Sequence, residues 1–455
     1  MDDLLSARAL MGLSLFFHTF FTPLGIGLPL LLFITEGIGL KTGDQRYRSI
    51  ARGWTPVVGL LFAVGAVSGT VLSFELGMLW PGFMNYAGGI IGMPFSLEGF
   101  AFFTEAIFLA AYIYGWDRLS ARAHWLLGIP LFVSAALSAV FVIAANSWMN
   151  APDGFSVVNG EVVNVNPWDA MFNAAWAHQA IHGTIASYVV TGFAIAGVYA
   201  WLGLRGKWDA RSPLAMKLAM GMGLAALVVQ IVSGDLASRR VYDLQPSKFA
   251  AMEGVHETQE GAPFVIGGVP IDGENRFAIE IPKGLSLLMQ GDPDAEIRGM
   301  DQVPEDERPN EVLTHLSFQA MVGSGFAMLG IALWYWAAWW RNRGRDAWMP
   351  GRWLARASIL GGFLSFVALQ AGWFVTEFGR QPWVVYGYLR TEDAATSRGG
   401  VDLIFLVFTV LYIVLAVGLI YVLFRWPWRR WEEDAPAPAD PRPAPLQDGE
   451  VSNDA

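Results

Sequence analysis

Residues 372–383, GWFVTEFGRQPW, decide how the rest of this sequence is interpreted. They close an apolar run that begins near Ala357, so a helix of membrane-spanning character ends on a carboxylate, Glu377, three residues before Arg380. An ionisable side chain inside a lipid-facing helix costs several kcal/mol, and such a side chain usually faces a cavity or a partner. This pattern makes Glu377 a candidate functional residue.

The end of this helix is marked by two helix-breaking residues. Pro382 cannot continue a helix and Gly379 weakens one, so Glu377 is predicted where the helix gives way to an outer loop. An ordinary interfacial ion pair, flanked by Trp373 and Trp383 as belt aromatics, is the alternative interpretation of the same residues.

The composition is that of a membrane protein. Of the 455 residues, 54% are hydrophobic and only 15% are charged. Cysteine is absent, which excludes disulfides, thiolate-held iron–sulfur clusters and covalently attached c-type haem. The net charge of −10 offers no basic patch, so nucleic acid is not an expected partner.

Long apolar runs predict an all-α, polytopic bundle of about nine transmembrane helices. The segments after the first, third, fifth, seventh and ninth runs are rich in Lys and Arg, and those after the second and fourth contain neither. The positive-inside rule therefore predicts an outside N-terminus and a cytoplasmic C-terminus. The predicted spans are 13–35, 55–77, 95–115, 125–146, 180–203, 216–235, 317–340, 356–377 and 402–424.

Four regions follow from this pattern. Residues 1–235 hold the first six helices, 236–314 form a polar external loop, 315–430 hold the last three helices, and 431–455 form a Pro- and Ala-rich cytoplasmic tail expected to be disordered. A loop as long as 236–314 is usually functional or disordered. Its first part, QPSKFAAMEG at 245–254, has helical spacing and is expected to be ordered.

Side chains able to bind a metal or carry protons gather toward the outer side of these helices. A single His on an apolar helix is more often structural than functional, but several helices presenting such groups at one depth favour a cofactor site inside the bundle. The candidates are His18, Glu98, Glu105, His178, His182, Met321 and Glu377.

Haem is the cofactor that these residue types fit best. His and Met are the axial ligands of low-spin haems, and His alone suits a five-coordinate, oxygen-reactive haem. His178 and His182 are four residues apart and could also hold a metal together, although two His are a weak signal.

The sequence resembles subunit I of the cytochrome bd-type quinol oxidases over essentially all nine predicted spans. Such enzymes oxidise a membrane quinol and reduce dioxygen to water with a low-spin haem b, a high-spin haem b and usually haem d. The resemblance rests on the stretches RALMGLSLFFHTFFTPLGIG, GTVLSFELGMLWP, FSLEGFAFFTEAIFLAAYIYGWDRLS, NSWMNAP, HGTIASY, QPSKFAAMEG, MVGSGFAML and GWFVTEFGRQPW.

The resemblance also implies the haem ligands. It assigns His182 and Met321 to the low-spin haem, and His18 and Glu377, as a pair, to the two high-spin haems, one of them haem d or a further haem b in its place. Trp373 and Arg380 match the surroundings of the Glu377 haem.

Further roles come from the same resemblance. Glu98 and Glu105 match carboxylates that deliver protons from the cytoplasm, with Ser138 on the same path. Lys248 and Glu253 match the quinol-oxidising loop, where Glu253 would accept the hydroxyl proton and Lys248 would steady negative charge.

The resemblance implies a location, partners and a branch. The chain is expected in the bacterial cytoplasmic membrane, beside a second membrane subunit and a small single-helix subunit. Its external loop lacks a segment that some members carry, as in the short-loop form, and the motifs resemble the cyanide-insensitive branch. Gln319 stands where some relatives have Arg, which should lower the potential or stability of the nearby haem.

Two other classes compete with the oxidase. A proton-coupled secondary transporter could use Glu98, Glu105 and Glu377, but the sequence shows no inverted repeat. A cytochrome b without oxygen chemistry would need pairs of His on facing helices, and the chain has only six His.

Overall fold

The computed structural model describes residues 3–345, 347–396 and 398–433. Within these residues, nine helices are long and apolar enough to cross a membrane, which confirms the predicted all-α membrane bundle. They are α1 (Asp3–Thr42), α2 (Gln45–Leu79), α3 (Pro81–Gly115), α4 (Ala121–Asn150), α6 (Trp176–Leu204), α7 (Ser212–Leu244), α10 (Glu311–Arg341), α11 (Arg352–Phe378) and α13 (Val401–Glu433).

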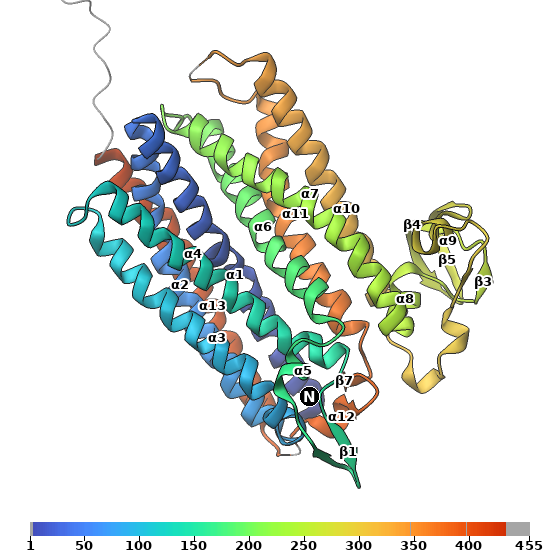
Figure 1. The fold of residues 1–455 in the computed structure, drawn as a ribbon. Coiled ribbons are helices and arrows are strands. Elements are labelled where there is room, and N and C mark those ends of the chain that lie inside the picture. Colours follow the sequence, from blue (N-terminus) through green and yellow to red (C-terminus); the bar gives the residue numbers. More distant parts are fainter. Residues whose placement is uncertain (1–2, 346, 397, 434–455) are drawn as a thin grey trace, which may run out of the picture.

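The long helices form two groups that lie side by side (Figure 1). In the first group α1 packs on α2 and α4, and α3 packs on α4. In the second group α6 packs on α7 and α11, and α10 packs on α11. Contacts of α6 with α1 and α4 join the two groups, and α13 lies against α1 and α2.

The helix α3 is much longer than the predicted span 95–115. It begins at Pro81, directly after the end of α2. The prediction of an outer loop between the second and third spans is therefore wrong. Residues Phe83, Ala87 and Ile90 are buried at helical spacing, which shows that one face of this glycine-rich segment packs in the bundle. A search for continuous apolar runs misses a helix of this kind.

The external loop is shorter than predicted and holds strands. Because α7 continues to Leu244 and α10 starts at Glu311, the loop comprises residues 245–310, not 236–314. It contains α8 (Pro246–Glu253), β3 (Gln259–Glu260), β4 (Phe264–Ile271), β5 (Glu274–Ile281), α9 (Gly284–Gln290), β6 (Glu296–Ile297) and the 3-10 turns η1 (Met300–Gln302) and η2 (Glu305–Glu307).

The β4–β5 hairpin was not anticipated from the sequence, although its turn carries a recognisable signal. Asp272 and Gly273 connect the two strands with φ values of 53° and 77°. A two-residue turn with both φ values positive matches the twist of a hairpin, and Asp-Gly is a preferred pair there.

Short elements close the end of the bundle where the N-terminus lies (Figure 1). We call this the outer end, in keeping with the predicted orientation. Its elements are β1 (Ser156–Val158), β2 (Glu161–Val163), α5 (Pro167–Met171), β7 (Trp383–Val385), β8 (Leu389–Arg390) and α12 (Thr391–Ala394).

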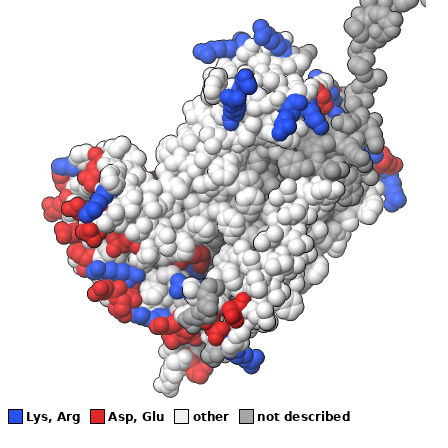
Figure 2. Space-filling model, turned by 180° about the vertical axis from the view of Figure 1, so that it is seen from behind, with Lys and Arg blue, Asp and Glu red and all other residues white. Residues whose placement is uncertain are grey.

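The charges are distributed as expected for a membrane protein with this orientation. Figure 2 shows Lys and Arg at the end of the bundle opposite the external loop, a broad band almost free of charge, and most Asp and Glu on the loop side. The predicted tail, 431–455, lies outside the described residues except for its first three, which belong to α13.

Candidate functional site

The outer end of α11 presents an ion pair between the buried Arg380 and the half-buried Glu377. The helix ends at Phe378, as the sequence predicts, and Arg380 Nη2 donates to Glu377 Oε2 at 2.6 Å. Arg380 is only 1% exposed, and its Nε and Nη1 have no partner among the described residues. Unpartnered buried donors are costly, so this guanidinium is arranged to bind a further acceptor.

Gly379 has a different role from the one expected. Its backbone is helical, with φ −68°, and does not need glycine for its conformation. A Cβ at this position would lie 2.6 Å from the Cγ of Lys248 and 2.6 Å from the carbonyl oxygen of Val375. Glycine is therefore needed here for the close approach of α8, rather than for ending α11.

The helix α8 is held firmly against the bundle. Gly254 ends it in the left-handed conformation, φ 71°, which glycine adopts without strain. Phe249 is fully buried in an apolar cluster that includes Leu285 and Ile297 of the external loop and Val375 of α11. This packing confirms the order predicted for 245–254 and fixes the two ionisable residues of α8.

Lys248 is buried next to the Glu377–Arg380 pair. It is 3% exposed, and its Nζ donates to Asn150 Oδ1 at 2.6 Å and to Gln245 Oε1 at 2.7 Å. Burial, with a further contribution from Arg380, holds the pKa of Lys248 well below its usual range, and Glu377 opposes this shift.

Glu253 is buried at the other end of α8. It is 2% exposed, its Oε1 receives a long contact of 3.5 Å from Ser238 Oγ, and its Oε2 has no partner among the residues that the structure describes. Burial raises the pKa of Glu253 to about 8. A carboxyl group with a free oxygen and a pKa near neutrality is suited to accept a proton.

The two predicted histidine ligands each bond a serine hydroxyl of a neighbouring helix. His18 Nδ1 lies 2.8 Å from Ser68 Oγ of α2, and His182 Nδ1 lies 3.1 Å from Ser233 Oγ of α7. Each serine hydroxyl also donates to a carbonyl of its own helix. The serine oxygen can therefore only accept from the imidazole, which places the proton on Nδ1 and leaves Nε2 free as a ligand.

A repeated tripeptide supplies both serines. Val-Ser-Gly occurs at 67–69 and again at 232–234. A Cβ at Gly69 would lie 3.3 Å from His18 Cε1, and a Cβ at Gly234 would lie 3.3 Å from His182 Cε1. Both glycines give the imidazole ring room, and the repeat is the sequence signal that would have revealed these positioning residues.

His182 Nε2 is the atom expected to bind iron. In the structure it lies 2.9 Å from Nε2 of Gln230, and Oε1 of Gln230 has no partner in the described part of the chain. Met321, the other predicted low-spin ligand, packs on α11, where a Cβ at Gly372 would lie 3.1 Å from its Sδ. His178 and Trp373 are half-buried.

The carboxylates of α3 lie deeper than predicted. Glu98 Oε1 accepts from Ser138 Oγ of α4 at 3.0 Å, and Glu105 is 7% exposed. Because α3 begins at Pro81, Glu98 stands near its middle and Glu105 in its inner half, which corrects the placement of both in the outer half.

One buried carboxylate was missed from the sequence. Glu75 of α2 is fully buried, its Oε1 accepts from Ser14 Oγ at 2.6 Å, and no described residue bonds its Oε2. Ser14 lies one helical turn from His18, so this acid neighbours a predicted ligand. Its position within an apolar helix was the available signal.

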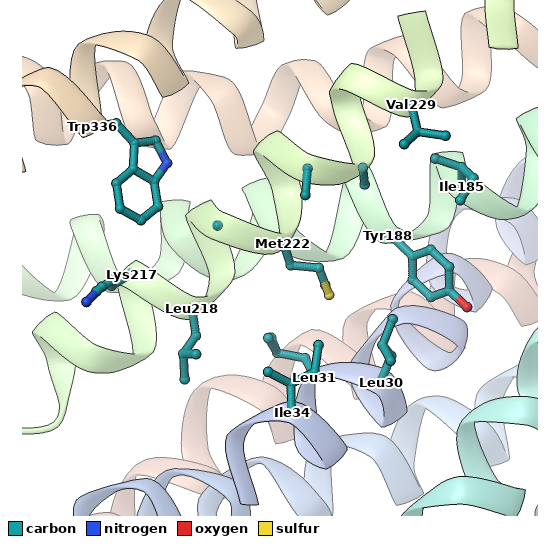
Figure 3. A pocket seen from close by; sticks show the side chains of 13 residues that line it. Leu30, Leu31, Ile34, Ile185, Tyr188, Lys217, Leu218, Met222, Val229 and Trp336 are labelled. Carbon is teal, nitrogen blue, oxygen red and sulfur yellow. The ribbon is translucent and has the colours of Figure 1, made fainter. Parts of the chain in front are cut away.

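A large apolar cavity lies apart from these groups. It has a volume of about 640 Å³ and lies between α1, α6, α7 and α10 (Figure 3). Leu31, Met222 and Trp336 contribute to its lining, and Lys217 is the only charged residue among those that line it. None of the predicted ligands lines it, so the cavity does not define the candidate site.

Comparison with known proteins identifies the family. A sequence model described as "Cytochrome bd terminal oxidase subunit I" matches residues 6–428. The chain belongs to this family. The resemblance inferred from the sequence motifs is therefore confirmed.

Three relatives illustrate the similarity. A Bacillus subtilis protein named as a cytochrome bd menaquinol oxidase subunit I is 36% identical, over 93% of this chain and 96% of the relative. Subunit 1 of the Escherichia coli cytochrome bd-II ubiquinol oxidase is 28% identical, over 92% and 95%. The structure of the bd oxidase from Geobacillus thermodenitrificans superposes with a TM-score of 0.89 at 37% identity, over 94% of this chain and 99% of that one.

The side chains present fit the haem groups that a cytochrome bd subunit implies. His18 and His182 each keep an unprotonated Nε2, which in His182 accepts from Gln230 Nε2, and Arg380 has two buried donors suited to an anionic group. In the described part of the chain, no three His, Asp or Glu side chains gather as a metal site. Haem takes one or two axial ligands from the protein and needs no such cluster.

The two histidines of α6 can be separated by mutation. We expect His182→Ala to remove the low-spin haem signal, because its Nε2 is the predicted ligand, and His178→Ala to leave the signal largely in place. Reduced-minus-oxidised spectra of the purified oxidase measure both. Loss of the signal in His178→Ala alone, with His182→Ala unaffected, would show that the ligand assignment is wrong.

The serine partners give a second prediction for this cytochrome bd subunit. Ser68→Ala removes the acceptor for His18 Nδ1, and losing such a partner typically weakens metal binding about 10- to 100-fold. We expect lower retention of the His18 haem, measured as haem content after mild detergent treatment. Ser73→Ala on the same helix is the control, because its hydroxyl bonds only its own backbone. Equal haem retention in the two variants would contradict the role of Ser68.

Proposed function

We propose that this chain oxidises quinol at α8, on the outer side of the membrane, and reduces dioxygen to water at haems held by His18 and Glu377. Protons for the reduction come from the cytoplasm, so turnover contributes to a proton-motive force. Family membership makes the chain a subunit of a terminal quinol oxidase and a multi-pass protein of the bacterial cytoplasmic membrane. The proton-coupled transporter is accordingly not favoured.

The observation that carries the proposal is the seating of α8 on the end of α11. One short helix carries two buried ionisable residues, Lys248 and Glu253, and Lys248 lies beside the Glu377–Arg380 pair. Buried ionisable groups with shifted pKa values are typical of functional sites. Here one of them, Lys248, is adjacent to a predicted haem ligand.

Four side chains would hold the haems. His182 and Met321 would bind a low-spin haem b, while His18 and Glu377 would each bind a high-spin haem, one a haem b and the other haem d or a further haem b. When bound, these groups supply electron transfer and dioxygen reduction. The chain's own contribution is to orient the ligands, through Ser68 and the matching serine of α7 for the histidines, and through Arg380 for Glu377.

The quinol site follows from the chemistry of α8. A quinol hydroxyl must lose its proton as it is oxidised, and the free Oε2 of Glu253 is placed to accept it. Lys248 Nζ would donate to the quinol oxygen and steady the negative charge that develops there. Both side chains are shielded from bulk water, which strengthens these interactions.

The helix α3 would supply protons from the cytoplasmic side. Glu105 and Glu98 are seven residues apart on one face of α3, and Ser138 of α4 bonds to Glu98. A proton arriving from the inner end would pass Glu105 first and then the Glu98–Ser138 pair.

Further subunits complete the proposed oxidase. A second membrane subunit and a small single-helix subunit would cover part of the apolar surface. Large apolar side chains are exposed on α3 and α13, including Phe100 at 72% and Leu403 at 64%. Lipid and protein can both cover such faces.

Quinol oxidation should depend on pH through Glu253. The pKa of Glu253 is about 8, so at a lower pH this carboxyl group is mostly protonated and cannot accept a proton. The rate of quinol oxidation should therefore rise as the pH is raised through about 8. Glu253→Gln should reduce quinol oxidation about 10²- to 10⁴-fold and remove this rise. Steady-state oxygen consumption across pH, with the haem spectrum recorded in parallel, measures both effects.

Lys248 can be tested in the same way, with Lys283 of the same loop as the matched control. Lys248→Ala should also slow quinol oxidation strongly with the haem spectrum intact, whereas Lys283→Ala should not, because Lys283 is an exposed residue paired with Asp294. Unchanged turnover in both Lys248→Ala and Glu253→Gln would remove α8 from the quinol site.

Proton delivery can be separated from electron transfer at Glu105. Glu105→Gln keeps the shape of the side chain but removes the titrating proton, so oxygen turnover should fall about 10²-fold or more. Anaerobic reduction of the haems by quinol should still proceed at its normal rate. The exposed Glu161 offers a control, Glu161→Gln. Near-normal turnover of Glu105→Gln would assign this acid a structural role.

A further inference from the structure

Two asparagines at the outer end of α4 link α8 to Glu377. Lys248 Nζ donates to Asn150 Oδ1 at 2.6 Å, and Asn150 Nδ2 donates to Asn146 Oδ1 at 3.0 Å. Asn146 Nδ2 then donates to Glu377 Oε1 at 3.0 Å. Four side chains from three helices thus form one unbroken line of hydrogen bonds. The two asparagines have no role in the proposed function.

The direction of this line is fixed by its two ends. The hydrogens on Lys248 Nζ can only be donated to an amide oxygen, so Asn150 must present Oδ1 to it. An ionised Glu377 can only accept, so Asn146 must present Nδ2. Both amides therefore have one possible orientation, and all three hydrogen bonds run from Lys248 toward the carboxylate. Hydrogen bonds aligned in this way strengthen one another in a buried site.

The surrounding structure holds the line in place. Asn146 and Asn150 are one helical turn apart on α4, and Asn150 Nδ2 also donates to the backbone oxygen of Asn146 at 2.9 Å. Asn150 is 1% exposed. The missing side chain of Gly379 lets Lys248 reach this position. Little movement of Lys248 is possible without lengthening a bond in the line.

We propose that Asn146 and Asn150 are positioning residues that couple the quinol site at Lys248 to the haem ligand Glu377. The coupling rests on the proposed function for the identity of the two sites. When Lys248 turns toward a quinol oxygen, it weakens its bond to Asn150. The hydrogen bond from Asn146 to Glu377 then weakens, and the carboxylate of Glu377 carries more negative charge. By reciprocity, the state of the group bound at Glu377 alters the affinity for quinol.

A purely structural line would behave differently. If the asparagines only tied α4 to α8 and α11, replacing them would lower the free energy of unfolding. The quinol KM and the haem potential of the folded enzyme would stay unchanged. Coupling instead predicts that one substitution changes a measured property at both ends of the line.

The test uses the purified, haem-loaded oxidase. Asn150→Leu breaks the line while filling similar space. We expect the quinol KM to rise about tenfold, which corresponds to about 1.4 kcal/mol, with a smaller change in kcat. The midpoint potential of the Glu377 haem should fall, because a carboxylate that receives less hydrogen bonding stabilises oxidised iron. Spectroelectrochemical titration without quinol measures the potential.

A second variant guards against misfolding. Asn150→Asp keeps the shape and the acceptor for Lys248 but removes the donor to Asn146. The quinol KM should stay within about twofold of the parent while the Glu377 haem potential still falls. Asn173→Leu is the matched control, because Asn173 is buried nearby and bonds Ser147 and backbone atoms without belonging to the line. It should leave both the KM and the potential unchanged.

The outcomes separate this proposal from the proposed function. An unchanged Glu377 haem potential in both Asn150 variants would overturn the coupling, whatever the KM. If Lys248→Ala left the KM unchanged, the quinol site itself would be wrong. The coupling would still predict a lowered potential in Lys248→Ala, since that measurement needs no quinol.

Discussion

Two buried basic side chains, Lys248 and Arg380, lie beside a single carboxylate, Glu377, and the outer end of the molecule is built around this imbalance. A buried charge is tolerated only when it is paired or well hydrogen-bonded. Lys248 meets this requirement through amide oxygens of Asn150 and Gln245. Arg380 is paired with Glu377, but two of its nitrogens lack partners among the described residues. The site therefore favours anionic or electron-rich ligands, as haem propionates and a quinol oxygen are.

The same imbalance explains why α8 must lie where it does. Without α8, Glu377 would be a carboxylate at the end of an apolar helix, paired only with the guanidinium of Arg380. Such an arrangement is an ordinary interfacial ion pair. Docking of α8 over Gly379 brings the buried Lys248 into the pair's surroundings. The packing of Phe249 against Val375 contributes the apolar burial that offsets the cost of enclosing Lys248.

Sequence patterns could predict the elements that depend on local spacing. Nine apolar runs, the end of α11 after Glu377 and the order of α8 all follow from neighbouring residues. The start of α3 at Pro81 could not be seen, because burial of one face by tertiary contacts stabilises a segment rich in glycine. Ser68 lies fifty residues from His18, and Asn146 lies far from Glu377. Only the folded chain brings such pairs together, so the partners of the predicted ligands were missed.

Buried charged side chains are hydrogen-bonded to different degrees at the two ends of the bundle. At the inner end Glu36 accepts from Tyr112 at 2.7 Å and pairs with His124 at 2.7 Å, while His124 Nε2 donates to the Tyr112 carbonyl at 2.9 Å. This cluster leaves no atom for a ligand and is best understood as a clamp between α1, α3 and α4. Among the charged side chains described, those with unpartnered buried atoms are Glu75, Glu253 and Arg380, all toward the outer end. Unfilled hydrogen-bonding capacity of this kind is tolerated where ligands bind, and here it is found at the same end of the bundle as the candidate site.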